Sequence, residues 1–334
     1  MEDELFKALY VLISQEARRR PRRKRVRFSD EIILLVAFWA VLHDRPISWA
    51  CSVDHWHGAL PWLALPSGPT MSRRLRTLSL QLLLEQVFYR LLALDAAAGF
   101  CLTRRIDSKP LPVGGFSKDR DARRGYATGG VSKGYKLFAC WGKSPLLPEA
   151  MVLGPLNESD QAGAMHLIDR LQQTHGAATG GYLLADATHD TNPLHEHAGA
   201  HGLQLLAPRK QPGTQLGHRD HSPHRLRSIE LLEAPRLPLK NPMPSLGVEL
   251  YRLRGQIERD YGNLGSFGGG LQPLPNFVRR PRRIAFWVIA KLIINGLRPL
   301  KNLLPHAAAS AKSDADLQGG FTWNASTLNR PSPT

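Results

Sequence analysis

Acidic residues, cysteines and long apolar runs are all scarce in this chain of 334 residues. Aspartate and glutamate total 28, against 44 lysines and arginines. The three cysteines, Cys51, Cys101 and Cys140, show neither pairing nor metal-ligand spacing, which argues against a disulfide scaffold and favours a reducing compartment. The longest uninterrupted apolar run, residues 32–42, has eleven residues, and a membrane helix needs roughly 20. No signal peptide is evident, so we expect a cytoplasmic protein without a membrane span.

The shortage of acids leaves a formal net charge of +16, which is distributed unevenly along the chain. Eight of the ten residues at 18–27 are basic, and residues 279–283 form a second cluster, Arg-Arg-Pro-Arg-Arg. A charge of this size indicates a polyanionic partner and says nothing about the fold. The alternative interpretation of the first run is a solvated tail or linker, although such a tail would also meet phosphates.

The chain is long enough for two domains, because about 150 residues is typical of one. Residues 1–95 predict an all-helical region, since apolar residues recur at helical spacing in residues 5–13, 32–42 and 78–94. Ser29 is placed to cap the second of these helices, with two acids in the first turn. The aromatic core of the region is predicted to contain Trp39, Trp49, Trp56 and Trp62.

A short basic helix is predicted after Pro69, with Thr70 as its cap. It would present Arg73, Arg74 and Arg76 to solvent. This pattern resembles the second helix of a helix-turn-helix and indicates a DNA-binding role for the three arginines. Any exposed basic helix would show a similar pattern.

From about residue 100 the pattern becomes that of an α/β domain, which we place at residues 96–305. Three strand-like runs come first, and then helix, strand, helix and strand alternate, with Asn192-Pro193 opening the second helix. This order predicts a mixed sheet flanked by helices, antiparallel at its start and parallel later. An irregular insertion is expected at about 211–245, and a long helix at 283–297 closes the domain. Residues 306–334 lack periodicity and predict a disordered tail.

Three carboxylates occupy positions where such a fold would bring them together. Asp107 lies within the first strand, Asp186 ends the strand at 181–186, and Glu258 lies in a helix after the insertion. Asp186 could simply cap a strand or open a turn. However, ligands gather at the carboxyl ends of parallel strands, and three such acids suit a two-metal phosphoryl-transfer site of the ribonuclease-H-like type. Hard oxygen ligands favour Mg²⁺ or Mn²⁺.

Several ordered motifs resemble the DDE transposases of bacterial insertion sequences. The stretch "RIDSKPLPV" looks like the strand with that family's first aspartate, and "RRGYATGGVSKGYKLFACWG" is similar to its Gly-Tyr-Lys hairpin, which contains Lys133 and Lys136. Tyr251, Arg254 and Glu258 match the signature of Tyr, two residues, Arg, three residues and Glu. The likeness covers residues from about 100 to 300.

The resemblance implies an enzyme that cleaves DNA at the ends of an insertion sequence and transfers the strand to a target. Its catalytic metal ligands would be Asp107, Asp186 and Glu258, holding two Mg²⁺ or Mn²⁺ ions. The DNA contacts implied in this domain are Tyr251, Arg254, Lys133 and Lys136. The partners would be the terminal inverted repeats and the target DNA. A homodimer would pair the two ends, and the protein would associate with the nucleoid.

Two positions depart from the family pattern. The signature continues through six residues to a lysine, where this chain has Gly265, and the usual Gly-Tyr-Asp after the second aspartate is replaced by Thr188-His189-Asp190. These departures leave a second interpretation, a catalytically decayed relic that acts only as a sequence-preferring DNA-binding protein. A structural basic protein that condenses nucleic acid is a third.

Helical periodicity bears on which acid is the third ligand. A single helix would place Leu246, Leu250, Leu253, Ile257, Tyr261 and Leu264 on one buried stripe. Glu258 borders that stripe with Tyr251 and Arg254, while Glu249 and Asp260 lie roughly 180° and 200° around the helix from Glu258. We therefore expect Glu258 to be the ligand.

Two histidine-rich stretches carry a weaker signal. They contain His195, His197 and His201, then His218, His221 and His224. A zinc site needs about four ligands, and no cysteine lies nearby, so a solvated, partly basic loop that contacts DNA is the favoured interpretation.

Overall fold

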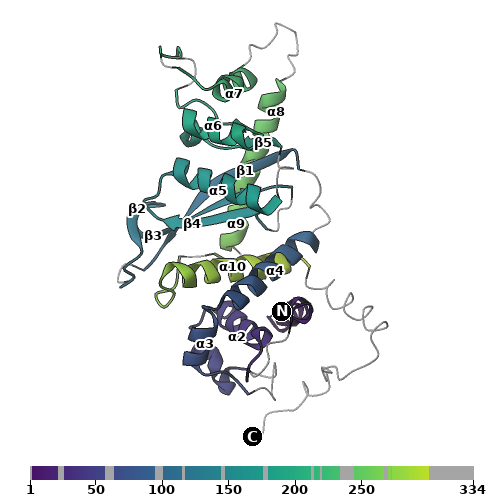
Figure 1. The fold of residues 1–334 in the computed structure, drawn as a ribbon. Helices are drawn as coiled ribbons and strands as arrows, with labels where there is room; N and C mark the ends of the chain where they lie inside the picture. The colour runs from purple at the N-terminus through teal and green to yellow at the C-terminus, as the bar shows by residue number, and fades with distance from the viewer. Residues whose placement is uncertain are drawn as a thin grey trace, which may run out of the picture. The chain divides into compact units, whose positions relative to one another are not determined.

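Two compact units make up the computed structural model, and each is described by itself (Figure 1). The structure describes residues 2–21, 26–56, 64–94, 101–114, 117–143, 147–175, 180–211, 214–218, 220–233, 244–266, 270–271 and 273–300. One unit comprises Met1–Leu91 and Trp287–Thr334, and the other comprises Leu92–Phe286. The boundary between the units thus falls within the closing helix. The expected tail at 306–334 lies outside the described residues.

The first unit contains the predicted N-terminal helices. They are α1 (Glu2–Arg18), α2 (Asp30–Leu42), α3 (Gly68–Arg74) and α4 (Leu78–Leu94), with 3-10 turns η1 (Trp49–Cys51) and η2 (Val53–His55) between α2 and α3. The helices expected at 5–13, 32–42 and 78–94 are confirmed. Ser29 caps α2 as predicted, because its hydroxyl accepts a hydrogen bond from the backbone N–H of Ile32 at 3.3 Å.

The prediction for the short basic helix was wrong about its start. Helix α3 begins at Gly68 with Ser67 at the N-cap position, so Thr70 lies inside the helix and Pro69 occupies the first turn. A proline is well tolerated there because the first turn has no intrahelical partner for its missing N–H. Arg76 follows the helix rather than lying on it.

Aromatic side chains form much of the core of the first unit. The rings of Trp39 and Trp56 stack with centroids 4.9 Å apart, and Phe6 packs edge-on against both. Both indole N–H groups are satisfied by backbone carbonyls, at 2.9 and 2.8 Å. Trp49 is only half-buried, and Trp62 lies outside the described residues.

Helix α10 (Pro281–Leu297) connects the units and carries a buried lysine in its second half. Lys291 is 1 % exposed, and its ammonium nitrogen lies 2.7 Å from the carboxylate of Asp44, which follows α2. Burial lowers the pKa of Lys291, although Asp44 opposes this effect. This ion pair joins α10 to the chain that follows α2.

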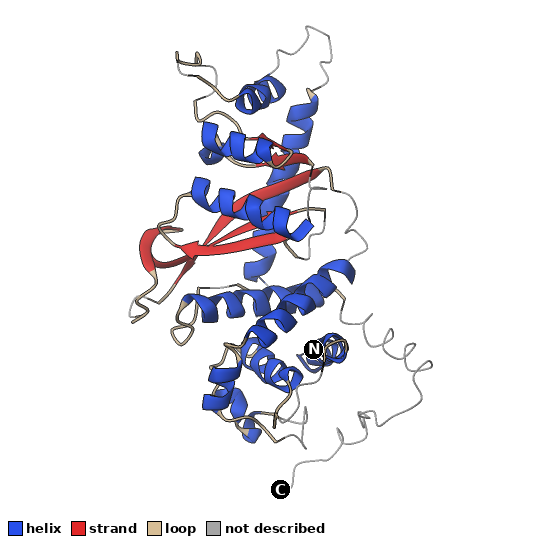
Figure 2. Cartoon of the chain, viewed as in Figure 1, coloured by secondary structure: helices blue, strands red, loops and turns tan. Residues whose placement is uncertain are grey.

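The second unit is built on a six-stranded mixed sheet (Figure 2). Its strands are β1 (Thr103–Pro112), β2 (Arg123–Ala127), β3 (Gly130–Trp141), β4 (Ala150–Pro155), β5 (Gly181–Leu184) and β6 (Leu203–Leu206). The strand order is β2-β3-β1-β5-β6, and β4 also pairs with β3. Strands β1, β5 and β6 are parallel, whereas β3 is antiparallel to each of its neighbours. This arrangement confirms the expected ribonuclease-H-like sheet.

Strand β2 was not expected from the hydrophobic pattern, which placed residues 123–130 between strands. The structure pairs β2 with the start of β3 in a hairpin. Thr128 and Gly129 form its turn. Gly129 and Gly130, the first residue of β3, have φ of 96° and 119°, backbone angles that residues with a Cβ rarely adopt.

Helices cover both faces of the sheet. They are α5 (Asp160–His175), α6 (Asn192–Ala200), α7 (Pro223–Glu233), α8 (Leu246–Arg252) and α9 (Gln256–Ser266), with 3-10 turns η4 (Ala187–His189) and η5 (Leu253–Gly255). One face packs against α5 and α6 through a core that includes Ile106, Phe138, Leu183 and Leu205. Helix α9 contacts β1 on the other face.

Two predictions for the later helices were partly wrong. The insertion expected at 211–245 contains a regular helix, α7, which packs against β6 and α8. The single helix expected from Leu246 to Leu264 is divided by η5. Ile257, Tyr261 and Leu264 are buried as predicted, but Leu246 and Leu253 are exposed because the 3-10 turn rotates α8 out of phase with α9.

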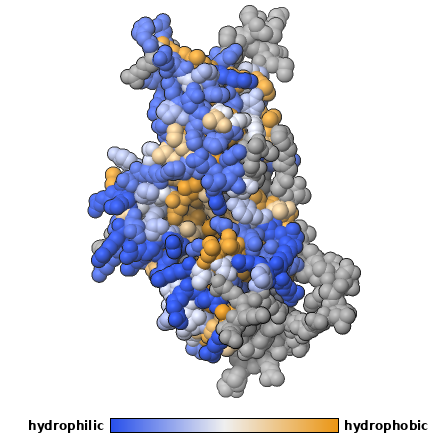
Figure 3. Space-filling model, in the orientation of Figure 1, coloured by the Kyte–Doolittle hydropathy of each residue, from blue (hydrophilic) through white to orange (hydrophobic). Residues whose placement is uncertain are grey.

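No helix in the described ranges is long and apolar enough to span a lipid bilayer. Hydrophilic residues cover much of the face shown in Figure 3.

Close packing of α5 on the sheet predicts unequal effects for two glycine substitutions. A Cβ at Gly163 would lie 2.2 Å from the buried ring of Phe138, whereas a Cβ at Gly262 in α9 would meet no atom within 4 Å. We expect Gly163→Ala to lower the free energy of unfolding by about 1–3 kcal/mol through overpacking. Gly262→Ala should raise it by up to about 1 kcal/mol through helix propensity. Urea unfolding of both variants checks this, and equal effects would contradict the packing argument.

Candidate active site

Strand register aligns two of the predicted catalytic aspartates. In the parallel pair of β1 and β5, Arg105 lies opposite Leu184. Asp107 follows two residues later within β1, and Asp186 follows two residues after Leu184, just beyond the end of β5 and with extended backbone angles, so the two aspartates lie at equivalent distances from the last paired residues. Because side chains alternate along a strand, both point to the same face of the sheet.

That face is the one covered by α9. Ile106 and Leu183 belong to the core beneath α5 and α6, so their neighbours in the strands point the other way. The hydroxyl of Tyr261 in α9 donates a hydrogen bond to the backbone carbonyl of Asp107 at 2.9 Å. Helix α9 is therefore fixed directly over the strand that carries the first aspartate.

Arg254 links all three predicted catalytic acids. Its Nη2 lies 3.3 Å from Oδ2 of Asp107 and 3.9 Å from Oδ2 of Asp186, and its Nη1 lies 3.7 Å from Oε1 of Glu258. Arg254 lies in the η5 turn, and its side chain is largely buried. A cationic group thus occupies the space between the two aspartates, which is the position where a metal ion is expected.

Glu258 is the least embedded of the three acids, because its side chain is 74 % exposed. It lies in the first turn of α9, four residues after Arg254. Within the described part of the chain, the three predicted ligands do not form a group whose ligand atoms all lie within 4.8 Å of one another. The assignment of Glu258 as third ligand therefore stays a prediction.

The turn that follows β5 holds Asp186 in place. Oδ1 of Asp186 accepts hydrogen bonds from the backbone N–H and the hydroxyl of Thr188, at 3.0 and 2.5 Å, and lies 2.6 Å from Nδ1 of the buried His189. Burial raises the pKa of Asp186, but the hydrogen bonds from His189 and Thr188 outweigh it and hold the pKa below its usual range. The residues that depart from the family's Gly-Tyr-Asp thus orient the second aspartate and keep it ionised.

Asp190 stabilises the C-terminal end of the same turn. Arg225 of α7 donates two hydrogen bonds to its carboxylate, both at 2.7 Å, and Nε2 of the fully buried His195 lies 3.3 Å away. Burial opposes ionisation, yet these contacts lower the pKa of Asp190 to about 2. The expected insertion therefore supplies a cation that anchors the loop carrying Asp186.

Asp107 and Tyr251 experience a less polar environment. Burial raises the pKa of Asp107, opposed by the backbone N–H of Ser108 and by Arg254. Burial also raises the pKa of Tyr251, and the charges of Asp186 and Asp107 add to this shift. The tyrosine of the signature therefore lies in the electrostatic field of both aspartates and stays protonated at neutral pH.

A second buried pair, absent from the sequence prediction, holds α9 against the sheet. Nη2 of Arg105 lies 3.3 Å from Oδ2 of Asp260 and donates a hydrogen bond to the carbonyl of Gly142 at 2.7 Å. Burial raises the pKa of Asp260 to about 6 despite this neighbour. The expectation that Glu258, and not Asp260, borders the buried face was wrong, because Asp260 is buried and the side chain of Glu258 is 74 % exposed.

The basic residues expected to bind DNA have varied surroundings. Lys136 donates to the carbonyl of Glu158 at 2.8 Å and lies 3.2 Å from the carboxylate of Asp160, the first residue of α5. Lys133 contacts the carbonyl of Ser117 at 3.4 Å. Neither of these contacts involves Asp107 or Asp186.

The arginines near α3 belong to the first unit. Arg74 donates to the carbonyl of Phe28 at 2.7 Å and to the carboxylate of Asp30 at 2.6 Å, so it ties α3 to the start of α2. Arg73 and Arg76 are exposed. Arg76 donates to the hydroxyl of Ser72 at 3.3 Å.

The donor set of the site fits a hard divalent cation. Asp107 and Asp186 present carboxylate oxygens to one partly exposed space, and the structure satisfies this negative charge with the guanidinium of Arg254. Oxygen donors without sulfur are those that Mg²⁺ and Mn²⁺ prefer. Glu258 could complete the set by a movement of its exposed side chain.

Comparison with known proteins identifies the family. A cryo-EM structure of a piggyBac transposase synaptic complex with hairpin DNA is similar with a TM-score of 0.42 and 11 % identity, over 95 % of this chain and 75 % of that one. No curated protein sequence matches. The family model described as the transposase DDE domain matches residues 103–293, which is more than half of the chain and includes all three predicted acids. The chain therefore belongs to the transposase DDE domain family.

Proposed function

We propose that this chain is an active DDE transposase that cleaves DNA at the ends of an insertion sequence and joins the freed strand to a target. Family membership supports transposition as the process. The observation that carries the catalytic proposal is the alignment of Asp107 and Asp186 on adjacent parallel strands, on one face of the sheet, with a cationic side chain between them.

In this proposal, Asp107, Asp186 and Glu258 hold two divalent ions, Mg²⁺ or Mn²⁺. When bound, such ions neutralise charge at the scissile phosphate and help to generate the attacking oxygen nucleophile. His189 and Thr188 keep Asp186 oriented and ionised through their hydrogen bonds to its carboxylate. Arg254 would release the aspartates and turn its planar guanidinium to a DNA phosphate, which it can bind through two parallel hydrogen bonds.

The net charge of +16 supports binding to duplex DNA at terminal inverted repeats and at the target. In the first unit, Arg73 and Arg76 would contact DNA, whereas Arg74 mainly supports the helix that presents them. Tyr251, Lys133 and Lys136 would add contacts in the second unit. We further propose that a homodimer pairs the two ends, in the cytoplasm and in association with the nucleoid.

Specific observations also favour a second function, that of a decayed relic which binds DNA without cutting it. Glu258 is mostly exposed, and the position of the signature lysine is Gly265. Such a relic would retain the basic surface but lack metal-dependent cleavage. Incubation of purified protein with a duplex carrying the element's own ends, with Mg²⁺ or Mn²⁺, separates the two functions.

Asp107→Asn should abolish cleavage of end DNA while leaving DNA affinity within about threefold, because it removes a ligand charge without changing side-chain size. The measurement is metal-dependent nicking beside an electrophoretic binding assay. Wild-type protein without added metal is the matched blank. Nicking by purified Asp107→Asn at the wild-type rate would place the active site elsewhere.

Glu258→Gln should reduce cleavage by at least about 100-fold, a loss typical of a removed catalytic group, whereas Glu249→Gln should retain most activity. Glu249 makes a suitable control because it lies in the preceding helix, is exposed, and pairs only locally with Arg252 at 2.6 Å. Asp260→Asn would be a poor control because it breaks the buried contact with Arg105. Equal activity of the two glutamine variants would remove Glu258 from the site.

Arg73→Ala should affect DNA binding, whereas Arg74→Ala should affect the stability of the first unit. The first should weaken binding to end DNA without changing the melting temperature, because Arg73 is exposed. The second should lower the melting temperature, because it removes the partly buried guanidinium that donates to Asp30 and to the carbonyl of Phe28. Fluorescence anisotropy with end and random duplexes, beside thermal unfolding, measures both. Identical behaviour of the two variants would refute the division of roles.

A further inference from the structure

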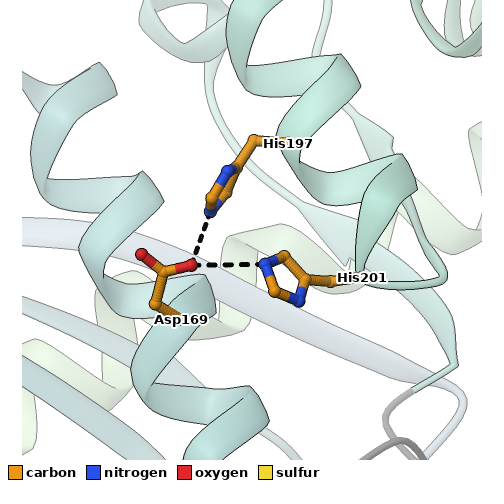
Figure 4. Close-up of side chains that lie close together, drawn as sticks. All are labelled: Asp169, His197 and His201. Carbon is orange, nitrogen blue, oxygen red and sulfur yellow. Dashed lines mark ion pairs between the residues drawn. The ribbon is translucent and has the colours of Figure 1, made fainter.

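Three side chains outside the proposed active site converge on one point between α5 and α6 (Figure 4). They are Asp169 of α5, His197 of α6 and His201, which directly follows α6. Nε2 of His197 lies 2.8 Å from Oδ1 of Asp169, and Nε2 of His201 lies 3.2 Å from the same oxygen. In the described part of the chain, no other set of three histidine, cysteine or acidic side chains brings its ligand atoms within 4.8 Å of one another.

Helix geometry explains the convergence. Residues four apart on a helix lie on one face, one turn above each other, so His197 and His201 point in the same direction. That face meets α5, because α5 and α6 pack side by side over the sheet. The two rings contact each other edge-on with centroids 4.9 Å apart.

The spacing of the ligand atoms suits a small metal ion. In a tetrahedral site with metal–ligand distances of about 2.0–2.1 Å, ligand atoms lie about 3.3 Å apart. The two measured nitrogen–oxygen separations, 2.8 and 3.2 Å, are close to that value. Nε2 of His197 is also buried and makes no well-aligned hydrogen bond in the structure, although it lies close to Asp169. This nitrogen therefore remains available to bind a metal ion.

We propose that Asp169, His197 and His201 bind one transition-metal ion of the Zn²⁺ class, with a fourth position left to solvent. Imidazole nitrogens distinguish this site from the oxygen-only set of the active site and favour Zn²⁺ over Mg²⁺. The three side chains are 26–43 % exposed, so an ion can reach them from solvent.

The ion would have a structural effect on the second unit. Helix α6 begins directly after the turn that contains Asp186 and Asp190, and α5 precedes β5. A metal bridge would therefore join the two helices on either side of the strand that leads to the second catalytic aspartate. This site lies on the α5 and α6 face of the sheet, and its existence does not depend on whether the chain cleaves DNA.

The test uses untagged, metal-stripped, full-length protein carrying Asp107→Asn and Asp186→Asn, so that the oxygen ligands of the other site do not contribute. Titration with Zn²⁺ by calorimetry, and with Co²⁺ by visible absorption, should reveal one site. His201→Ala and Asp169→Asn should each weaken Zn²⁺ binding by at least about 100-fold, because even the loss of a second-layer partner costs about 10–100-fold. Zn²⁺ should raise the melting temperature of the parent but not of these variants.

His166→Ala provides the matched control, because the chain has 13 histidines that could bind zinc weakly. His166 is exposed on the same helix as Asp169 and pairs instead with Glu158 at 3.3 Å. Its removal should leave the Zn²⁺ titration and the Co²⁺ spectrum unchanged. Circular dichroism without metal checks that each variant folds. If a histidine variant does not fold, Asp169→Asn tests the proposal instead, because it preserves the shape of the side chain.

Two outcomes would overturn the proposal. One is the absence of a stoichiometric Zn²⁺ site in the parent protein. The other is a site whose affinity falls equally in His166→Ala and His201→Ala. In either case the three residues contact one another without binding a metal ion.

Discussion

The parallel pairing of β1 with β5 is the constraint on which the geometry of the proposed active site depends. It sets Arg105 opposite Leu184 and so brings Asp107 level with Asp186, two residues further along each strand. A slip of one residue in either strand would turn its aspartate to the face covered by α5 and α6, where Ile106 and Leu183 pack. The apolar core on that face therefore enforces the register, and the register determines which carboxylates can share a cation.

Removing carboxylates from water is electrostatically unfavourable, and arginines from other elements of the second unit offset this effect. Arg254 approaches Asp107 and Asp186, Arg225 binds Asp190, and Arg105 approaches Asp260. A buried charge is stable only when it is paired and hydrogen-bonded. The first pair differs from the others because Arg254 is shared between several acids at longer distances, so it is the contact that a stronger cation or a DNA phosphate can most readily replace.

Several parts of the fold could be predicted from the sequence because they rest on local rules. Helical spacing of apolar residues located α1, α2, α4, α5 and α10, and the serine–acid pattern located the cap of α2. Alternating and apolar strand runs located β1, β3, β4, β5 and β6. Helix α7 and strand β2 were missed because their stability comes from packing on β6 and pairing with β3, contacts that a local pattern does not contain.

The sequence by itself indicated the family, most of the elements and the three candidate acids, because these depend on ordered motifs and on periodicity. Tertiary structure decided how those acids differ. The packing of α9 on the sheet buries Asp260 and leaves Glu258 exposed, and the fold brings Arg254 between the aspartates. Likewise, the histidine-rich segment looked like a basic loop until helix packing brought Asp169, 28 positions before His197, against two of its imidazoles. Such pairings join residues far apart in the chain, so only the folded arrangement determines them.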